Sequence, residues 1–207
     1  MPSRAVLLVN LGSPDSPGVP DVRRYLREFL MDGRVLDAPW PIRFFIVHGL
    51  ILPFRPKQSA EAYHKIWTKE GSPLVVTSRK VQAELQRRLP MPVELAMRYQ
   101  NPSIPAAVER LRAASVDDVL LLPLFPHFAM SSFETAVERV KEVIAESAPG
   151  MKLRVQPPCY AADDYIGALV ASAELLNRRD WREGLRTLDA TTIAAIVRAT
   201  GREIREP

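Results

Sequence analysis

Residues 53–74, PFRPKQSAEAYHKIWTKEGSPL, place an arginine, an aromatic helical stretch and a Gly-Ser-Pro turn directly after an apolar run. The planar guanidinium of Arg55 is suited to pairing with a carboxylate. Taken alone, an arginine in the position of Arg55 is usually a solvated rim residue, and Ser72 is a plausible helix N-cap followed by Pro73. Together with the neighbouring apolar and aromatic residues, they indicate a surface for a large flat apolar ligand that carries carboxylates.

Two further groups of polar residues follow short apolar runs. The first, Asn10-Leu11-Gly12-Ser13-Pro14, is not a nucleotide-binding fingerprint, because it has one glycine where three are needed and Pro14 lacks an N–H. The second is the pair Arg98-Tyr99, in which the tyrosine ring supplies apolar area and its hydroxyl can bond a carboxylate or a water. Both groups are expected in a ligand site at the end of a strand.

The loop of residues 123–132, PLFPHFAMSS, would line such a site with aromatic side chains. Its histidine, His127, has no HxH or HxxxH partner, so loop hydrogen bonding is favoured over metal ligation. We predict no metal-binding residues in the chain.

The elements that must position these residues alternate between two kinds. Short apolar runs at residues 5–9, 93–97, 119–122 and 153–155 predict buried strands. Helical patterns are found at residues 19–30, 59–67, 74–89, 104–114, 131–146 and 165–176. Ser103 is expected to cap the fourth helix, and Ser131 with Glu134 to form a capping box on the fifth. The alternation predicts an α/β fold with a doubly wound parallel sheet of flavodoxin or Rossmann type, in which ligands bind beyond the carboxyl ends of the strands.

Residues 41–54, PIRFFIVHGLILPF, allow two predictions. An apolar stretch of this length is typical of a core helix, and the same stretch, if exposed, would be an interaction surface. No run reaches the roughly 18 apolar residues that a membrane-spanning helix needs.

Composition limits the compartment and the partners. One cysteine, Cys159, excludes an intramolecular disulfide and favours the cytoplasm. The net charge of +4 comes from scattered basic residues, so nucleic-acid binding is not expected. The exception is an Arg-rich stretch at the C-terminal end.

The motifs LVNLGSP, FRPK…SAEAY…IWT…GSPL, MRY and PLFPHF-x-x-SS, in this order, resemble the ferrochelatase family over residues 4–176. The resemblance implies one of the two ferrochelatase lobes, and a lyase that inserts Fe²⁺ into protoporphyrin IX in the last step of haem biosynthesis. It assigns porphyrin contacts to five residues: Leu11, Arg55, Ser72, Arg98 and Tyr99. It also implies that residues 41–54 form an apolar lip over the site, with peripheral membrane contact.

The resemblance stops before the family's catalytic residues. No histidine follows His127, and neither an SxHGxP segment nor the cysteines of an iron–sulfur cluster occur. We therefore expect a porphyrin-binding domain at residues 1–176, a divergent tail with a short helix at residues 177–207, and little metal insertion by this chain alone. Truncation with a frame change and a half-length paralogue are both compatible with this pattern. A non-catalytic porphyrin- or haem-binding protein is the alternative function, and an unrelated nucleotide-binding domain is disfavoured.

Overall fold

The structure is a computed structural model that describes residues 3–176. Its centre is a parallel sheet of four strands, β1 (Arg4–Gly12), β2 (Val93–Tyr99), β3 (Asp118–Pro123) and β4 (Lys152–Val155), in the order β2-β1-β3-β4. All four predicted strands are present, and β1 and β2 extend to the polar residues that follow the apolar runs. The predicted tail, residues 177–207, lies outside the described residues.

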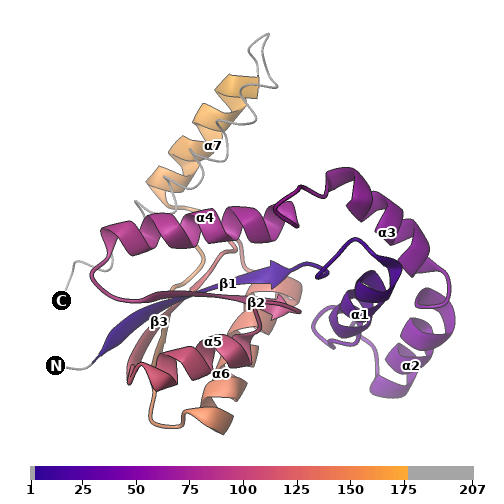
Figure 1. Cartoon of the computed structure of the whole chain (residues 1–207), viewed down its shortest axis with the longest axis horizontal. Helices are drawn as coiled ribbons and strands as arrows, with labels where there is room; N and C mark the ends of the chain where they lie inside the picture. The colour runs from indigo at the N-terminus through magenta and orange to yellow at the C-terminus, as the bar shows by residue number, and fades with distance from the viewer. Residues whose placement is uncertain (1–2, 177–207) are drawn as a thin grey trace.

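Helices cover both faces of the sheet. In β1, Leu7 and Val9 pack with α5 (Ile104–Ala113) and α6 (Thr135–Ser147), while Val6 and Leu8 face α4 (Pro73–Arg88). Figure 1 shows α4 on one side of the strands and α5 and α6 on the other. Because β1 is buried on both faces, its sequence is continuously apolar instead of alternating. The predicted doubly wound α/β class is confirmed.

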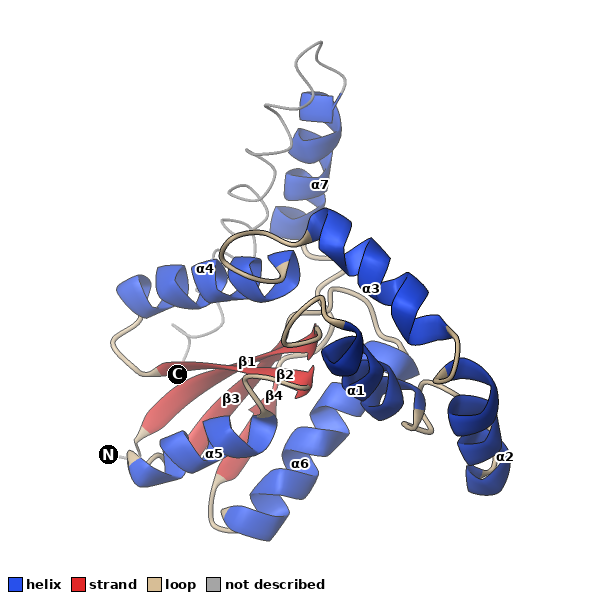
Figure 2. Cartoon of the chain, turned by 45° about the vertical axis from the view of Figure 1, so that its right-hand side comes forward, coloured by secondary structure: helices blue, strands red, loops and turns tan. Residues whose placement is uncertain are grey.

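A second group of helices lies beyond the end of β1. It consists of α1 (Val19–Leu30), α2 (Trp40–Phe45), the π-helical turn η1 (Ile46–Ile51) and α3 (Arg55–Ile66). The last helix, α7 (Asp163–Leu176), projects away from the sheet in both views (Figures 1 and 2). The predicted helix at residues 59–67 begins earlier, at Arg55, because Pro56 fits the first turn, where its missing N–H has no helical partner.

The predicted helix caps have different outcomes. Ser103 is the N-cap of α5, and its hydroxyl accepts a hydrogen bond from the backbone N–H of Ala106. The predicted capping box of Ser131 and Glu134 is wrong, because neither side chain caps the helix. The chain enters α6 through the π-helical turn η2 (Met130–Glu134), in which the N–H of Glu134 donates to the carbonyl of Ala129. Ser131 is therefore inside a turn instead of at a helix start.

Residues 41–54 form the short helical turns α2 and η1 instead of a core helix. Val47 is buried, as is Leu52, whereas the large side chains around them face solvent: Trp40, Ile42, Phe44, Phe45, Leu50 and Phe54. Phe45 is 63% exposed and Phe54 76% exposed. We call residues 41–54 the apolar lip, and contiguous exposed apolar surface of this kind is typical of an interaction site. Among the described residues, no helix is long and apolar enough to cross a bilayer.

Candidate functional site at the carboxyl edge of the sheet

The predicted site residues Leu11, Arg98 and Tyr99 lie where β1 and β2 end. The chain passes from β1 to β2 on one side and later returns past β1 to β3, so the strand order reverses between β1 and β3. Doubly wound sheets bind ligands at this kind of switch point. Ser72 lies at the same edge. The C-terminal end of α4 leads directly into the start of β2, so the N-terminal end of α4, where Ser72 is found, lies near the carboxyl ends of the strands.

The backbone of Gly12 lies close to the backbone of Tyr99 at this edge. It pairs with Tyr99 in the sheet and has a φ of +110°, which L-residues with side chains rarely adopt. A Cβ at this position would lie 2.1 Å from the carbonyl oxygen of Tyr99. Glycine therefore allows Leu11 and Tyr99 to end side by side on neighbouring strands.

A network around Asp32 ties the end of β2 to α1 and α6. The Arg98 guanidinium donates to the Asp32 carboxylate at 2.6 Å, and the Tyr99 hydroxyl donates to the same oxygen at 2.9 Å. The Thr135 hydroxyl also donates to Asp32, and Arg98 Nε donates to the Thr135 hydroxyl at 2.7 Å. The backbone N–H of Arg34 satisfies the other carboxylate oxygen at 2.8 Å.

The network shifts the pKa of two members. Burial alone would raise the pKa of Asp32, but the hydrogen bonds from Thr135, Arg34 and Tyr99 and the charge of Arg98 lower it below its ordinary value. Burial raises the pKa of Tyr99 above its ordinary value. At neutral pH the site therefore contains a charged Asp32–Arg98 pair and a protonated phenol.

Aromatic rings surround this network. The Tyr25 ring lies 6.4 Å from both Tyr63 and Tyr99, edge to face, and Phe29 lies 5.3 Å from Tyr99. Such edge-to-face pairs fix ring orientations and contribute about 0.5–1.5 kcal/mol each beyond the buried area. They place Tyr63, near the C-terminal end of α3, close to the strand edge.

The structure brings four of the five predicted site residues to one edge and separates the fifth. Leu11 is partly exposed, Ser72 is buried at the N-cap of α4 with no capping bond from its side chain, and Tyr99 is fully buried. Arg55 begins α3, a helix of 12 residues and therefore about 18 Å long. It is exposed, next to the apolar lip, and its partner is Gln58 at 3.5 Å.

Sequence reasoning missed Asp32 at this edge, and it placed Ser13 in a site motif without giving its hydroxyl a role. Asp32 lies in the turn after α1 and carries no periodic signal, so nothing in the sequence linked it to Arg98. Ser13 is 3% exposed, and its buried hydroxyl has no hydrogen-bond partner in the described structure. A buried hydroxyl without a partner at the end of β1 is suited to receive a polar ligand group or a water.

His127 packs between two tyrosine rings, stacked on Tyr160 and edge to face with Tyr165. Within residues 3–176, no group of three or more His, Cys, Asp or Glu side chains is arranged to hold a metal ion.

The fold defines a flavodoxin-like α/β lobe with a candidate site at the carboxyl edge of its sheet. The family model described as Ferrochelatase matches residues 3–183, and the chain belongs to this family. It is 53% identical over 174 residues to the ferrochelatase of Opitutus terrae, covering 83% of this chain and 50% of that relative. It is 51% identical over 182 residues to the ferrochelatase of a Pseudomonas putida strain, covering 87% of this chain and 54% of that relative. The ferrochelatase of Azotobacter vinelandii is 52% identical over 174 residues, covering 84% and 51%. The chain thus spans about half the length of the curated relatives it matches.

Proposed function

We propose that this chain provides the porphyrin-binding part of a ferrochelatase, which inserts Fe²⁺ into protoporphyrin IX in the last step of haem biosynthesis. Iron is a substrate of that reaction. The observation that carries the proposal is the family match over residues 3–183. It is supported by the positions of Leu11, Ser72 and Tyr99 at the carboxyl edge of the sheet. A partly exposed leucine beside polar groups is suited to a flat macrocycle with carboxylate substituents.

Three residues are proposed to touch the porphyrin. The Leu11 side chain would contact the macrocycle face from the end of β1. The Arg55 guanidinium is exposed, and its one contact among the described residues is a long one to Gln58, so it is available for a propionate carboxylate that extends from the macrocycle toward the apolar lip. The Ser72 hydroxyl is not used as a helix cap and is available to a ligand at the edge.

Contact of Arg98 and Tyr99 with the porphyrin stays a prediction. In this structure both side chains are bound to Asp32. We propose that their first contribution is to hold the ends of β1 and β2 in register, so that Leu11 and Ser72 keep their positions when the ligand binds.

Metal insertion also requires that two pyrrole N–H protons leave the porphyrin. General bases for such steps are commonly histidine or carboxylate side chains. The sequence has no counterpart of the family's SxHGxP histidine or of the later glutamate. We therefore assign binding and orientation of the macrocycle to this chain and proton removal to groups that it does not contain.

The test is a titration of the purified chain with protoporphyrin IX, followed by the shift of the Soret band. We expect a saturable shift, weakened by Arg55→Ala because a charge-assisted hydrogen bond is lost. Arg112→Ala removes the same charge from α5, where Arg112 is paired with Glu109, and serves as the control. The absence of a shift in the unmodified chain would end the proposal.

The apolar lip suggests a further contact. We propose that residues 41–54 touch a membrane surface peripherally, supported by the exposure of Phe45, Leu50 and Phe54. The cytoplasm is the proposed compartment, supported by the single cysteine.

A further inference from the structure

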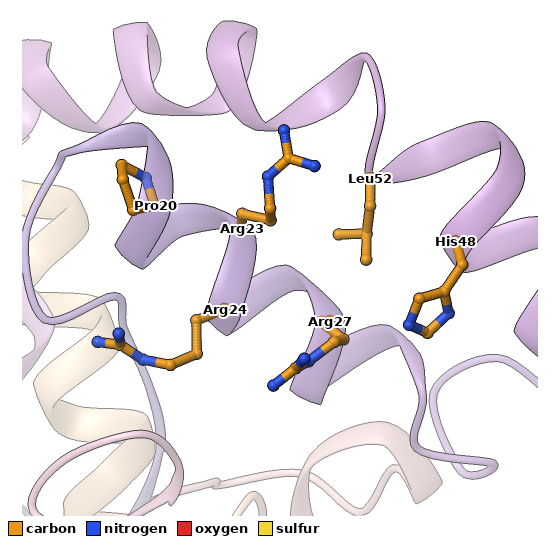
Figure 3. A pocket seen from close by; sticks show the side chains of 6 residues that line it. All are labelled: Pro20, Arg23, Arg24, Arg27, His48 and Leu52. Carbon is orange, nitrogen blue, oxygen red and sulfur yellow. The ribbon is translucent and has the colours of Figure 1, made fainter.

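A hollow of about 420 Å³ lies between α1 and η1, outside the strand-edge site. Its lining comes from two segments: Pro20, Arg23, Arg24 and Arg27 of α1, and His48 and Leu52 from η1 and the residue after it. Figure 3 shows the arginines along α1, with His48 and Leu52 reaching toward them from the neighbouring segment. This volume is within the range of about 300–1,000 Å³ that is common for small-molecule sites.

The hollow is on the outer side of α1. Val22 and Tyr25 are buried on the inner side, where the Tyr25 ring packs against Tyr63 and Tyr99. At 3.6 residues per turn, Arg23 and Arg27 fall on the opposite side of the helix. Arg23 and Arg27 therefore lie on the side of α1 opposite to Tyr25, whereas Arg24 at the border of the hollow donates to the side chain of Gln100, directly after β2.

Two of the three guanidinium groups have no acidic partner among the described residues. Arg24 is held by Asp15 at 2.7 Å and by Asp21 at 2.9 Å. The next acid on the helix, Glu28, is occupied by the side chain and the backbone N–H of Gln100. Within residues 3–176, the guanidinium groups of Arg23 and Arg27 make no hydrogen bond or ion pair. Like charges four residues apart destabilise a helix, and a bound anion would remove that cost.

The opposite wall of the hollow is apolar and continues into the lip. Leu52 is buried, and the His48 ring stacks on Phe44 at 4.2 Å between centroids. Phe44 and its neighbour Phe45 are exposed. Positive charge on one wall beside apolar surface on the other is suited to a ligand with an anionic head and an apolar portion.

We propose that this hollow is a phosphate-binding site in which Arg23 and Arg27 are the ligands. Guanidinium groups bind the several oxygens of a phosphate through paired, charge-assisted hydrogen bonds, and two unpaired forks one helical turn apart can bind one tetrahedral anion from two sides. Pro20, Leu52 and the stacked His48 line the hollow beside the arginines. The phosphate is either that of an anionic lipid headgroup or that of a small soluble phosphate ester.

The test compares the full chain with the double variant Arg23→Gln/Arg27→Gln. The control is Arg87→Gln/Arg112→Gln, which removes the same net charge from α4 and α5. Isothermal titration with inorganic phosphate and glycerol 3-phosphate measures soluble ligands. Co-sedimentation with vesicles of phosphatidylglycerol or of phosphatidylcholine measures lipid. Far-UV circular dichroism checks that both variants are folded.

We expect the double variant to bind phosphate at least about tenfold more weakly than the control, since two charge-assisted hydrogen-bonding groups are lost. A loss confined to phosphatidylglycerol vesicles identifies the lipid headgroup, and a loss confined to glycerol 3-phosphate identifies a soluble ester. Equal binding by the double variant and the control in every arm would overturn the proposal.

A Soret titration of the same double variant separates this site from the porphyrin cleft. An unchanged porphyrin shift combined with lost phosphate binding supports a distinct site. If the variant loses porphyrin binding and keeps phosphate binding, the arginines serve the porphyrin carboxylates and the phosphate assignment is wrong. Failure of porphyrin binding in the unmodified chain would contradict the proposed function without affecting this test.

Discussion

Replacing Asp32 with asparagine tests whether the network at the end of β2 holds the site together. Asp32→Asn keeps the shape of the side chain and removes its charge, which leaves the Arg98 guanidinium without an ion pair. The pair is largely shielded, with side-chain exposures of 15% for Arg98 and 7% for Asp32. Breaking a buried pair by removing one partner costs about 3–5 kcal/mol. Because the asparagine oxygen can still accept one hydrogen bond, we expect a loss of about 3 kcal/mol in the free energy of unfolding.

Thermal unfolding followed by circular dichroism measures this loss. For a protein of this size, 1 kcal/mol corresponds to about 2–4 °C, so Tm should fall by about 6–12 °C. Asp15→Asn is the matched control, since it removes the same charge from the exposed pair with Arg24, and such pairs contribute about 0–1 kcal/mol. Similar shifts for Asp15→Asn and Asp32→Asn would refute the structural role of the network.

The effect of Asp32→Asn also has a defined pH dependence. The pKa of Asp32 is lower in the folded chain than in the unfolded chain, so the carboxylate stabilises the fold fully above the unfolded pKa of about 3.9. This contribution is lost as the pH falls through the folded pKa. The difference in stability between the unmodified chain and Asp32→Asn should therefore be constant near neutral pH and decrease below about pH 4. A difference that stays constant down to pH 3 would contradict a depressed pKa.

Three further predictions concern the strand edge, the chemistry and the lip. Gly12→Ala should lower the free energy of unfolding, measured with urea, by about 3 kcal/mol or more, because strain at a positive φ adds to a clash with the Tyr99 carbonyl. Gly71→Ala, where the surroundings are open, should lower it by about 1 kcal/mol. Equal losses would argue against the close approach of Gly12 to Tyr99. The purified chain should form haem from Fe²⁺ and protoporphyrin at less than about one hundredth of the rate of a full-length ferrochelatase, because general acid–base groups contribute about 10²–10⁴-fold. Haem absorbance measured without oxygen tests this, and a normal rate would overturn the division of roles. Phe45→Ser/Phe54→Ser should weaken vesicle co-sedimentation about tenfold or more, since burying each phenylalanine contributes about 1.5–3 kcal/mol; unchanged co-sedimentation would exclude membrane contact through the lip.

The sheet could be predicted from the sequence because its strands are buried on both faces. Val6 and Leu8 pack on α4 while Leu7 and Val9 pack on α5 and α6, so no polar residue interrupts the run. The N-cap of α5 was also predictable, because the Ser103 hydroxyl accepts its hydrogen bond from the N–H of Ala106, only three residues later. Signals that are complete within a few neighbouring residues are visible without the fold.

The network and the phosphate-binding hollow could not be predicted because their parts come together only in the fold. Asp32 and Arg98 are 66 residues apart in the sequence. The arginines of α1 are visible as a basic helix face, but the apolar wall opposite them comes from η1.

The failed capping box at Ser131 has a local cause, because Ser-x-x-Glu spacing is the same whether the backbone forms an α-helical or a π-helical turn.

The central position of β1 determines when the sheet can form during synthesis. β1 leaves the ribosome first, yet its first ladder partner is β2, in which Val93 pairs with Val6, 87 residues later. At about 5–20 residues per second, the apolar strand waits roughly 4–17 s for that partner. β3, on its other side, follows still later. The nascent chain therefore carries an unpaired apolar strand for seconds, and we expect molecular chaperones that bind extended apolar segments to engage residues 5–9 before the rest of the lobe exists.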